Sequence, residues 1–86
     1  MSRHVLPALP GLEILVGWDR PLQTFWAQVW DLAYERDQPE AELAWVGCTP
    51  REITDPQDVV DTVAHWAKRI PVGLVAVLAD DAAAGR

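Results

Sequence analysis

The stretch LEILVGWDRPLQTFWAQVWD, Leu12–Asp31, decides the fold of this chain of 86 residues. Its first part alternates between two sets of residues, as a pleated strand does, so we predict a strand over 12–18. Asp19-Arg20-Pro21 then predicts a turn, because Asp opens turns and Pro brings no donor to a ladder. One face of the strand carries Leu12, Ile14, Val16 and Trp18, and the other carries Glu13, Leu15 and Gly17.

The second part of the stretch predicts a strand over 24–32. A helix is the alternative, because the large apolar residues also recur at helical spacing. The strand is favoured because Thr, Phe, Trp and Val suit pleated surfaces. It would carry apolar side chains on both faces, with Phe25, Ala27 and Val29 on one and Trp26 and Trp30 on the other.

A short third strand is predicted over 43–48, where Trp45 falls on one face and Ala44 and Val46 on the other. Asp55 and Pro56 then mark the start of a helix over 56–70, because Asp is a preferred N-cap and Pro suits the first helical position. Segment 72–83 predicts a second helix, although a strand over 72–78 is the alternative.

The predicted fold class is therefore α+β. We expect a three-stranded antiparallel meander over about 12–18, 24–32 and 43–48. One or two helices, over about 56–70 and 72–83, would follow it and pack on one face. The chain is too short for more than one domain, so residues 1–86 are expected to form a single unit. Within it, 1–11 is expected to be an irregular arm, because it holds two prolines and a glycine, and 84–86 a frayed tail.

The charge of the chain narrows the classes of partner. Thirteen acidic residues against seven Lys and Arg give a net charge of −6. This argues against direct binding to nucleic acid or to an anionic membrane, because both need basic charge. The N-terminal stretch has no uninterrupted apolar run of the signal-peptide kind. The single cysteine, Cys48, fits a reducing compartment, so we expect a cytoplasmic protein.

The apolar residues on the second face of the sheet are the first candidate for function. One layer of helices covers one face, so the other must be covered by the N-terminal arm, by a second copy of the chain or by a different protein. The leading expectation is a small non-catalytic protein-interaction module that uses an aromatic sheet face, since Trp is enriched in binding hot spots. The alternative is that the tryptophans form the core. The candidate partner-binding aromatic residues are Trp18, Trp26, Trp30 and Trp45.

The acidic loop over 34–42 is the second candidate. It is either a solvated connection or a negative patch that binds a basic protein. In the second case the protein would be an inhibitor, or a nucleic-acid mimic of the anti-CRISPR kind, acting on a nucleic-acid-binding machine. The carboxylates in question are Glu35, Asp37, Glu40 and Glu42.

A small enzyme is the third possibility, with Cys48 and His65 as its reactive pair. Asp61 precedes His65 by one helical turn and could orient it. No spacing in the chain specifies such a trio, so we expect no catalysis. We also expect no cofactor and no metal, because the two histidines lie far apart in sequence and no Gly-rich phosphate loop is present.

The segment Gly17–Asp31 also resembles a stretch shared by a group of small bacterial proteins to which no activity is attached. In that group a Gly-Trp-Asp turn precedes Pro-Leu and an aromatic, strand-like run. A Trp-Val-Gly segment, like Trp45–Gly47, and a Pro-Arg-Glu-Ile lead into helix follow it. The resemblance covers most of Leu12–Leu78 and implies no catalytic residues. It implies one structural unit made of Trp18, Asp19, Pro21, Leu22, Thr24 and Phe25.

Overall fold

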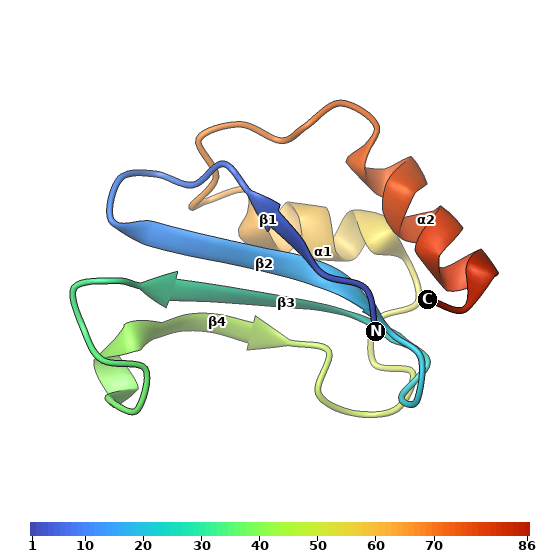
Figure 1. The fold of residues 1–86 in the computed structure, drawn as a ribbon, viewed down its shortest axis with the longest axis horizontal. Helices are drawn as coiled ribbons and strands as arrows, with labels where there is room; N and C mark the ends of the chain where they lie inside the picture. Colours follow the sequence, from blue (N-terminus) through green and yellow to red (C-terminus); the bar gives the residue numbers. More distant parts are fainter.

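Four antiparallel strands form one sheet, in the order β1-β2-β3-β4 (Figure 1). The computed structural model describes residues 1–86. The α+β class and the antiparallel sheet are confirmed, but the sheet has four strands where three were predicted. The strands are β1 (His4–Leu6), β2 (Leu12–Asp19), β3 (Thr24–Asp31) and β4 (Glu42–Val46).

The additional strand is β1, which lies within the segment predicted to be an irregular arm. It pairs with β2, with His4 opposite Val16 and Leu6 opposite Ile14. The prediction was wrong here because β1 is only three residues long and is followed at once by Pro7. Three residues are too few to show an alternating pattern, and the position of β1 depends on its pairing with the longer strand β2.

The β2–β3 hairpin has the predicted turn, and its strands pair along their whole length. Pairing runs without interruption from Leu12 opposite Asp31 to Asp19 opposite Thr24. In the turn, the backbone N–H of Leu22 donates to Asp19 Oδ1 at 3.2 Å, which is the bond of an Asx-turn.

Two helices, α1 (Pro56–Val63) and α2 (Leu74–Ala84), cover one face of this sheet, and in Figure 1 α1 lies behind it. Asp55 caps α1 as predicted, since its side chain accepts a hydrogen bond from the N–H of Gln57, and Pro56 follows at the first helical position. Within 72–78 the predicted helix is present from Leu74 onward, and the alternative strand was wrong. Neither helix has the length and apolar character needed to cross a bilayer. The core between the layers is formed by Leu6, Ile14, Val16, Trp18, Phe25, Ala27, Val29, Val59, Val60, Val63, Leu74 and Leu78.

Helix α1 is seven residues shorter than the predicted 56–70, because it ends at Val63. The chain beyond it runs alongside the N-terminal segment instead. The N–H of Leu9 donates to the carbonyl of Trp66, and the N–H of Lys68 donates to the carbonyl of Pro7, both at 2.9 Å. These long-range backbone bonds replace the helical ones that the apolar periodicity predicted.

The segment 84–86, which was expected to be a frayed tail, closes α2 with hydrogen bonds. The N–H of Gly85 donates to the carbonyl of Ala82 and the N–H of Arg86 donates to that of Asp81, which together form a Schellman motif at the end of α2. The Arg86 guanidinium also pairs with the carboxylates of Asp80 and Asp81, at 2.7 and 3.1 Å.

Candidate functional site

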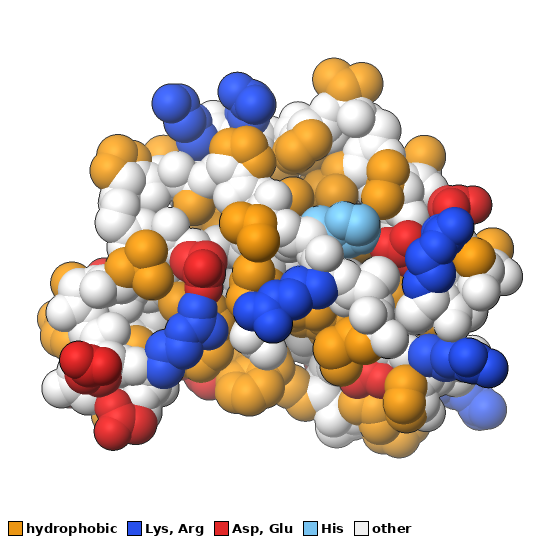
Figure 2. Space-filling model, viewed as in Figure 1, with side chains coloured by type: hydrophobic (Ala, Val, Ile, Leu, Met, Phe, Trp, Pro, Cys, Tyr) orange, Lys and Arg blue, Asp and Glu red, His pale blue; other side chains and the backbone are white.

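The face of the sheet opposite the helices, which we call the open face, carries its own small apolar cluster. Its buried members are Leu15, Trp26, Trp30 and Ala41. In Figure 2, which looks onto this face, apolar and basic side chains mix in the middle, and acidic side chains lie toward both ends. Of the three coverings considered for this face, the N-terminal arm is present, and the loop between β3 and β4 covers part of the face as well.

The first covering segment is the N-terminus. The N–H of Ser2 donates to the carbonyl of Trp18, and the N–H of Trp18 donates to Ser2 Oγ, both at 2.9 Å. The contact is close because position 17 is glycine: a Cβ there would lie 2.0 Å from the Ser2 carbonyl oxygen and 2.9 Å from Trp26 Nε1. The N-terminus therefore lies against β2 and over the edge of the Trp26 ring.

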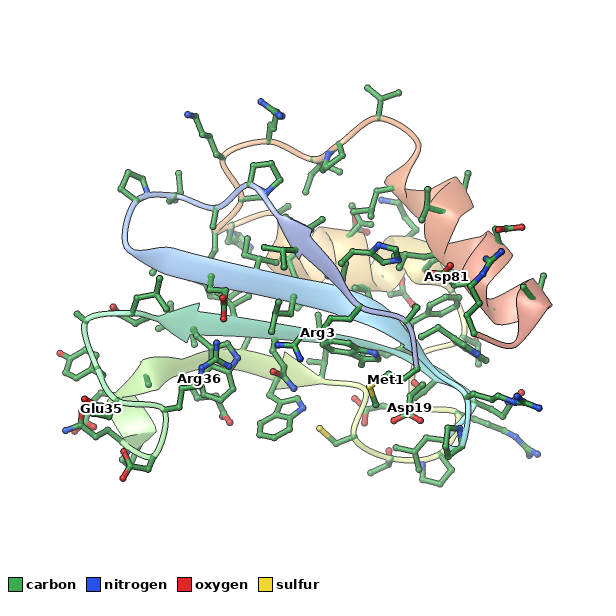
Figure 3. The ribbon with its side chains drawn as sticks, viewed as in Figure 1. Met1, Arg3, Asp19, Glu35, Arg36 and Asp81 are labelled. Atoms are coloured by element: carbon green, nitrogen blue, oxygen red, sulfur yellow. The ribbon has the colours of Figure 1, made fainter.

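The second covering segment is the loop between β3 and β4, which begins after Asp31 and ends in a 3-10 turn at Pro39–Ala41. Its Arg36 guanidinium lies over the Trp30 ring, 4.7 Å from the ring centroid, and pairs with the carboxylate of Glu13 on β2 (Figure 3). Trp30 Nε1 donates to Gln28 Oε1 at 3.0 Å. Trp30 is thus covered by the chain and has its polar atom satisfied.

Of the four tryptophans predicted to bind a partner, one has a large exposed surface. Trp18 packs in the core against Phe25, with ring centroids 4.8 Å apart. Trp26 and Trp30 on the open face are 6 and 7% exposed. Trp45 on β4 is 49% exposed, and its ring meets the edge of Trp30 at a centroid distance of 6.0 Å. Trp45 is therefore the half-exposed partner of the buried Trp30.

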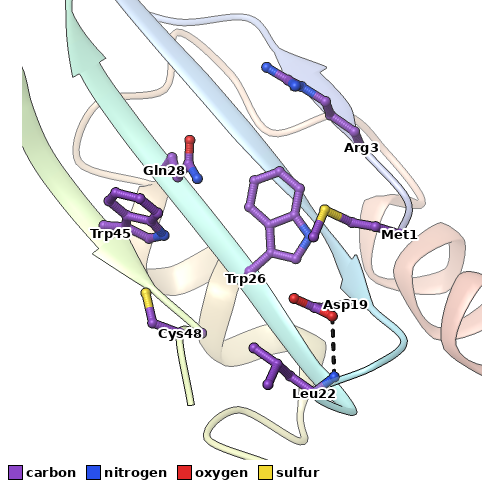
Figure 4. Close-up of a pocket in the computed structure, with 9 residues that line it drawn as sticks. Met1, Arg3, Asp19, Leu22, Trp26, Gln28, Trp45 and Cys48 are labelled. Atoms are coloured by element: carbon purple, nitrogen blue, oxygen red, sulfur yellow. Dashed lines mark hydrogen bonds between the residues drawn. The ribbon is translucent and has the colours of Figure 1, made fainter. Parts of the chain in front are cut away.

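Trp45 separates two hollows on the open face. The first, which we call the Cys48 hollow, has a volume of about 290 Å³ and opens between β3, the end of β4 and the N-terminus (Figure 4). Its lining is mostly apolar and includes Met1, Leu22, Trp26, Trp45 and Cys48, with Arg3 and Asp19 as its charged residues.

The second, which we call the acidic hollow, has a volume of about 370 Å³ and lies between Trp45 and the β3–β4 loop. It brings together four of the residues predicted to bind a partner: Trp30, Trp45, Asp37 and Glu42. Arg36 also lines it, but its charge is paired with Glu13. The other two predicted carboxylates, Glu35 and Glu40, are exposed on the same loop and do not line the hollow.

Glu52 is a structural residue of this region that sequence reasoning missed. Its carboxylate accepts hydrogen bonds from the backbone N–H groups of Gly47, Cys48 and Thr49 and from the Thr49 hydroxyl, at 2.8–3.2 Å. The Gly47 N–H and the other donors hold the pKa of Glu52 below its usual range. The spacing Thr-x-x-Glu, typical of a capping box, is the pattern that could have predicted it.

These bonds explain why β4 ends at Val46 and not at the predicted Cys48. Gly47 takes a positive φ of 83°, and a Cβ there would lie 2.1 Å from the carbonyl oxygen of Phe25. The chain turns away from β3 at this residue, which places Cys48 on the rim of its hollow.

The structure does not bring together the residues considered for catalysis. The Cys48 hollow contains neither His65 nor Asp61. The His65 ring packs edge-on against Trp66, and Asp61 accepts a hydrogen bond from Gln57. Burial, with the nearby carboxylates of Glu52 and Glu42, raises the pKa of the Cys48 thiol, which is the opposite of what a nucleophile needs. No group of three His, Cys, Asp or Glu side chains lies close enough to hold a metal ion.

Comparison with known protein families, curated proteins and solved structures finds no match to this chain.

Proposed function

We propose that this protein is a small, non-catalytic, cytoplasmic protein-interaction module that binds a cationic side chain of a partner protein in the acidic hollow beside Trp45. The observation that carries the proposal is the combination of a half-exposed Trp45 with the exposed carboxylates of Asp37 and Glu42 at one hollow. The free thiol of Cys48 fits the reducing environment of the cytoplasm.

The chemistry of the hollow suits a Lys or Arg side chain. An aromatic face attracts a cation with about 0.5–1 kcal/mol at an exposed site. The two carboxylates add Coulomb attraction, and the net charge of −6 steers a basic partner toward the protein. Arg36 on Trp30 shows the same pairing of guanidinium, indole and carboxylate within the chain.

The test is an NMR titration with a short, capped tetra-arginine peptide at low ionic strength. We expect the largest shifts at the Trp45 indole N–H and at the amides of Asp37 and Glu42. Trp45→Ala should weaken binding about two- to fivefold, and the matched control Val77→Ala, which truncates an exposed apolar residue on α2, should not change it. Equal binding by wild type and Trp45→Ala would contradict the proposal.

A broader acidic surface is the second candidate, because Glu35 and Glu40 are exposed beside the hollow. In that case the protein would inhibit a nucleic-acid-binding protein by presenting the whole loop. The double variant Glu35→Gln/Glu40→Gln distinguishes the two functions. If the hollow is the binding site, this double variant should bind the peptide nearly as well as the wild type does. If the whole loop is the binding site, it should weaken binding as much as the double variant Asp37→Asn/Glu42→Gln does.

A further inference from the structure

The two edges of the sheet differ in how they are protected. An edge strand presents unpaired N–H and C=O groups, and proteins block such edges with proline, with lysine or with a covering segment. On the β1 side, Pro7 and Pro10 follow the strand, and the backbone of Pro7–Leu9 bonds to that of Trp66–Lys68. This edge is closed to another chain over these residues.

The β4 edge has almost none of this protection. Glu42–Val46 contains no proline and no lysine. Apart from its ladder with β3, no hydrogen bond in the protein uses a backbone group of Leu43–Val46. The register with β3 shifts between Val29 and Trp30, which leaves Leu43 as a bulge and limits the regular edge to Ala44–Val46. The outward-facing backbone groups of these three residues, with Trp45 in their middle, therefore remain free to pair.

Charge indicates what kind of chain would pair there. Glu40 and Glu42 stand exposed at the start of β4, and Asp37 and Glu42 line the adjoining acidic hollow. A basic segment is attracted to this edge. A second copy of the chain would bring its own net charge of −6 to the same place, so charge does not favour self-pairing.

We propose that the free edge of β4 accepts an extended basic segment of a partner protein as a fifth strand, with one Lys or Arg of that segment in the acidic hollow beside Trp45. This rests on the proposed function and adds the conformation of the partner and its position on the sheet. Strand addition at an edge uses backbone bonds to hold the segment and a pocket to select its side chains. With only three regular residues to pair, the backbone bonds fix the register while Trp45 and the carboxylates provide the selectivity.

The experiment uses the whole protein and three capped ten-residue peptides in which arginine alternates with threonine. One peptide is unmodified, one is N-methylated at every arginine and one at every threonine. In an added antiparallel strand, the N–H groups of alternate residues face the edge of the sheet. Methylation of those residues removes the hydrogen bonds to β4. Methylation of the other residues points the methyl groups into solvent and leaves these bonds in place. We expect one methylated peptide to bind at least tenfold more weakly than the unmodified peptide, and the other to bind within about threefold of it.

A protein variant provides the independent check. Leu43→Lys places a charge at the bulge that adjoins the free edge, and Leu9→Lys makes the same change on an exposed residue of the N-terminal segment. We expect the first to weaken binding at least fivefold more than the second.

The outcomes separate the two proposals. If both methylated peptides bind like the unmodified one and binding still depends on Trp45, the fifth strand is wrong while the proposed function stands. If no peptide binds at all, both are wrong. A protein that sediments as a dimer at micromolar concentration, and as a monomer after Leu43→Lys, would assign the edge to a second copy and overturn the inference.

Discussion

Glu52 shows how much structure one exposed side chain can organise. Its carboxylate takes the N–H groups of three successive residues, Gly47, Cys48 and Thr49, which would otherwise have only water as a partner. A run of backbone N–H groups that converge on one anion is a nest, and here the chain supplies the anion itself. Glu52 thus fixes the end of β4 and the wall of the Cys48 hollow.

We expect Glu52→Gln to lower the free energy of unfolding by about 1 kcal/mol at neutral pH, because a neutral amide oxygen accepts these bonds less strongly than a carboxylate. Urea unfolding followed by tryptophan fluorescence measures this loss, with Glu40→Gln as the exposed control.

The pKa of Glu52 is lower in the folded protein than in the unfolded one. The stability that Glu52 contributes is therefore present above its usual pKa of 4.5 and is lost as the pH falls through the pKa of the folded protein. The difference between wild type and Glu52→Gln should therefore shrink in acid, and a difference that stays constant from neutral pH to pH 3 would contradict this account.

At the scale of elements, long periodic segments were predictable and short ones were not. β2 and β3 each have eight residues, rich in types that favour strands, so the local pattern predicted them, although a helix was the alternative for β3. β1 and the end of α1 depend on contacts between Pro7–Leu9 and Trp66–Lys68, which are far apart in sequence and leave no local pattern. The same applies to the site: Trp45 and the acidic loop were identified by composition, whereas the covering of Trp26 by the N-terminus depends on Gly17, an isolated glycine in a strand.

The N-cap of α1 gives a prediction at this scale. Asp55 accepts a hydrogen bond from the N–H of Gln57 at 2.9 Å, so Asp55→Ala leaves a first-turn donor without its partner. We expect a loss of about 1 kcal/mol in the free energy of unfolding. Thr54→Ala, at the exposed residue before it, is the control, and an equal loss in both variants would show that the cap is not the cause.

At the scale of the whole molecule, Asp81 joins the two ends of the described chain. It is 5% exposed on α2, and its Oδ2 lies 2.6 Å from His4 Nε2 on β1 while Arg86 binds its other oxygen. Burial alone would raise the pKa of Asp81, but hydrogen bonds from His4, Ser2 and Arg86 outweigh it and hold the pKa below its usual range. The carboxylate of Asp81 therefore links the N-terminal segment to the helical layer by hydrogen bonds.

This arrangement predicts an acid-sensitive fold. A carboxyl whose pKa is lowered on folding stabilises the protein above its unfolded pKa, and that stabilisation is lost as the pH falls through the folded pKa. We expect Asp81→Asn to cost about 2 kcal/mol at neutral pH and to reduce the fall in melting temperature between pH 5 and pH 2.5. Thermal unfolding of both proteins across this range measures it. Parallel curves for wild type and Asp81→Asn would show that other carboxylates cause the acid loss.

The hydrogen bond between His4 on β1 and Asp81 on α2 also fixes the order in which a ribosome can complete this fold. β1 is synthesised first, but Asp81 follows His4 by 77 residues. β2, β3 and β4 are joined by short connections and can pair as they emerge, whereas Leu74 and Leu78 reach the core only with α2. Until then, α1 is the only helix that covers the apolar face of the sheet in the nascent chain. An intermediate with exposed apolar surface of this kind binds chaperones and is prone to aggregate. Emergence of α2 from the ribosome, rather than pairing of the strands, then becomes the step that commits the polypeptide to its native state.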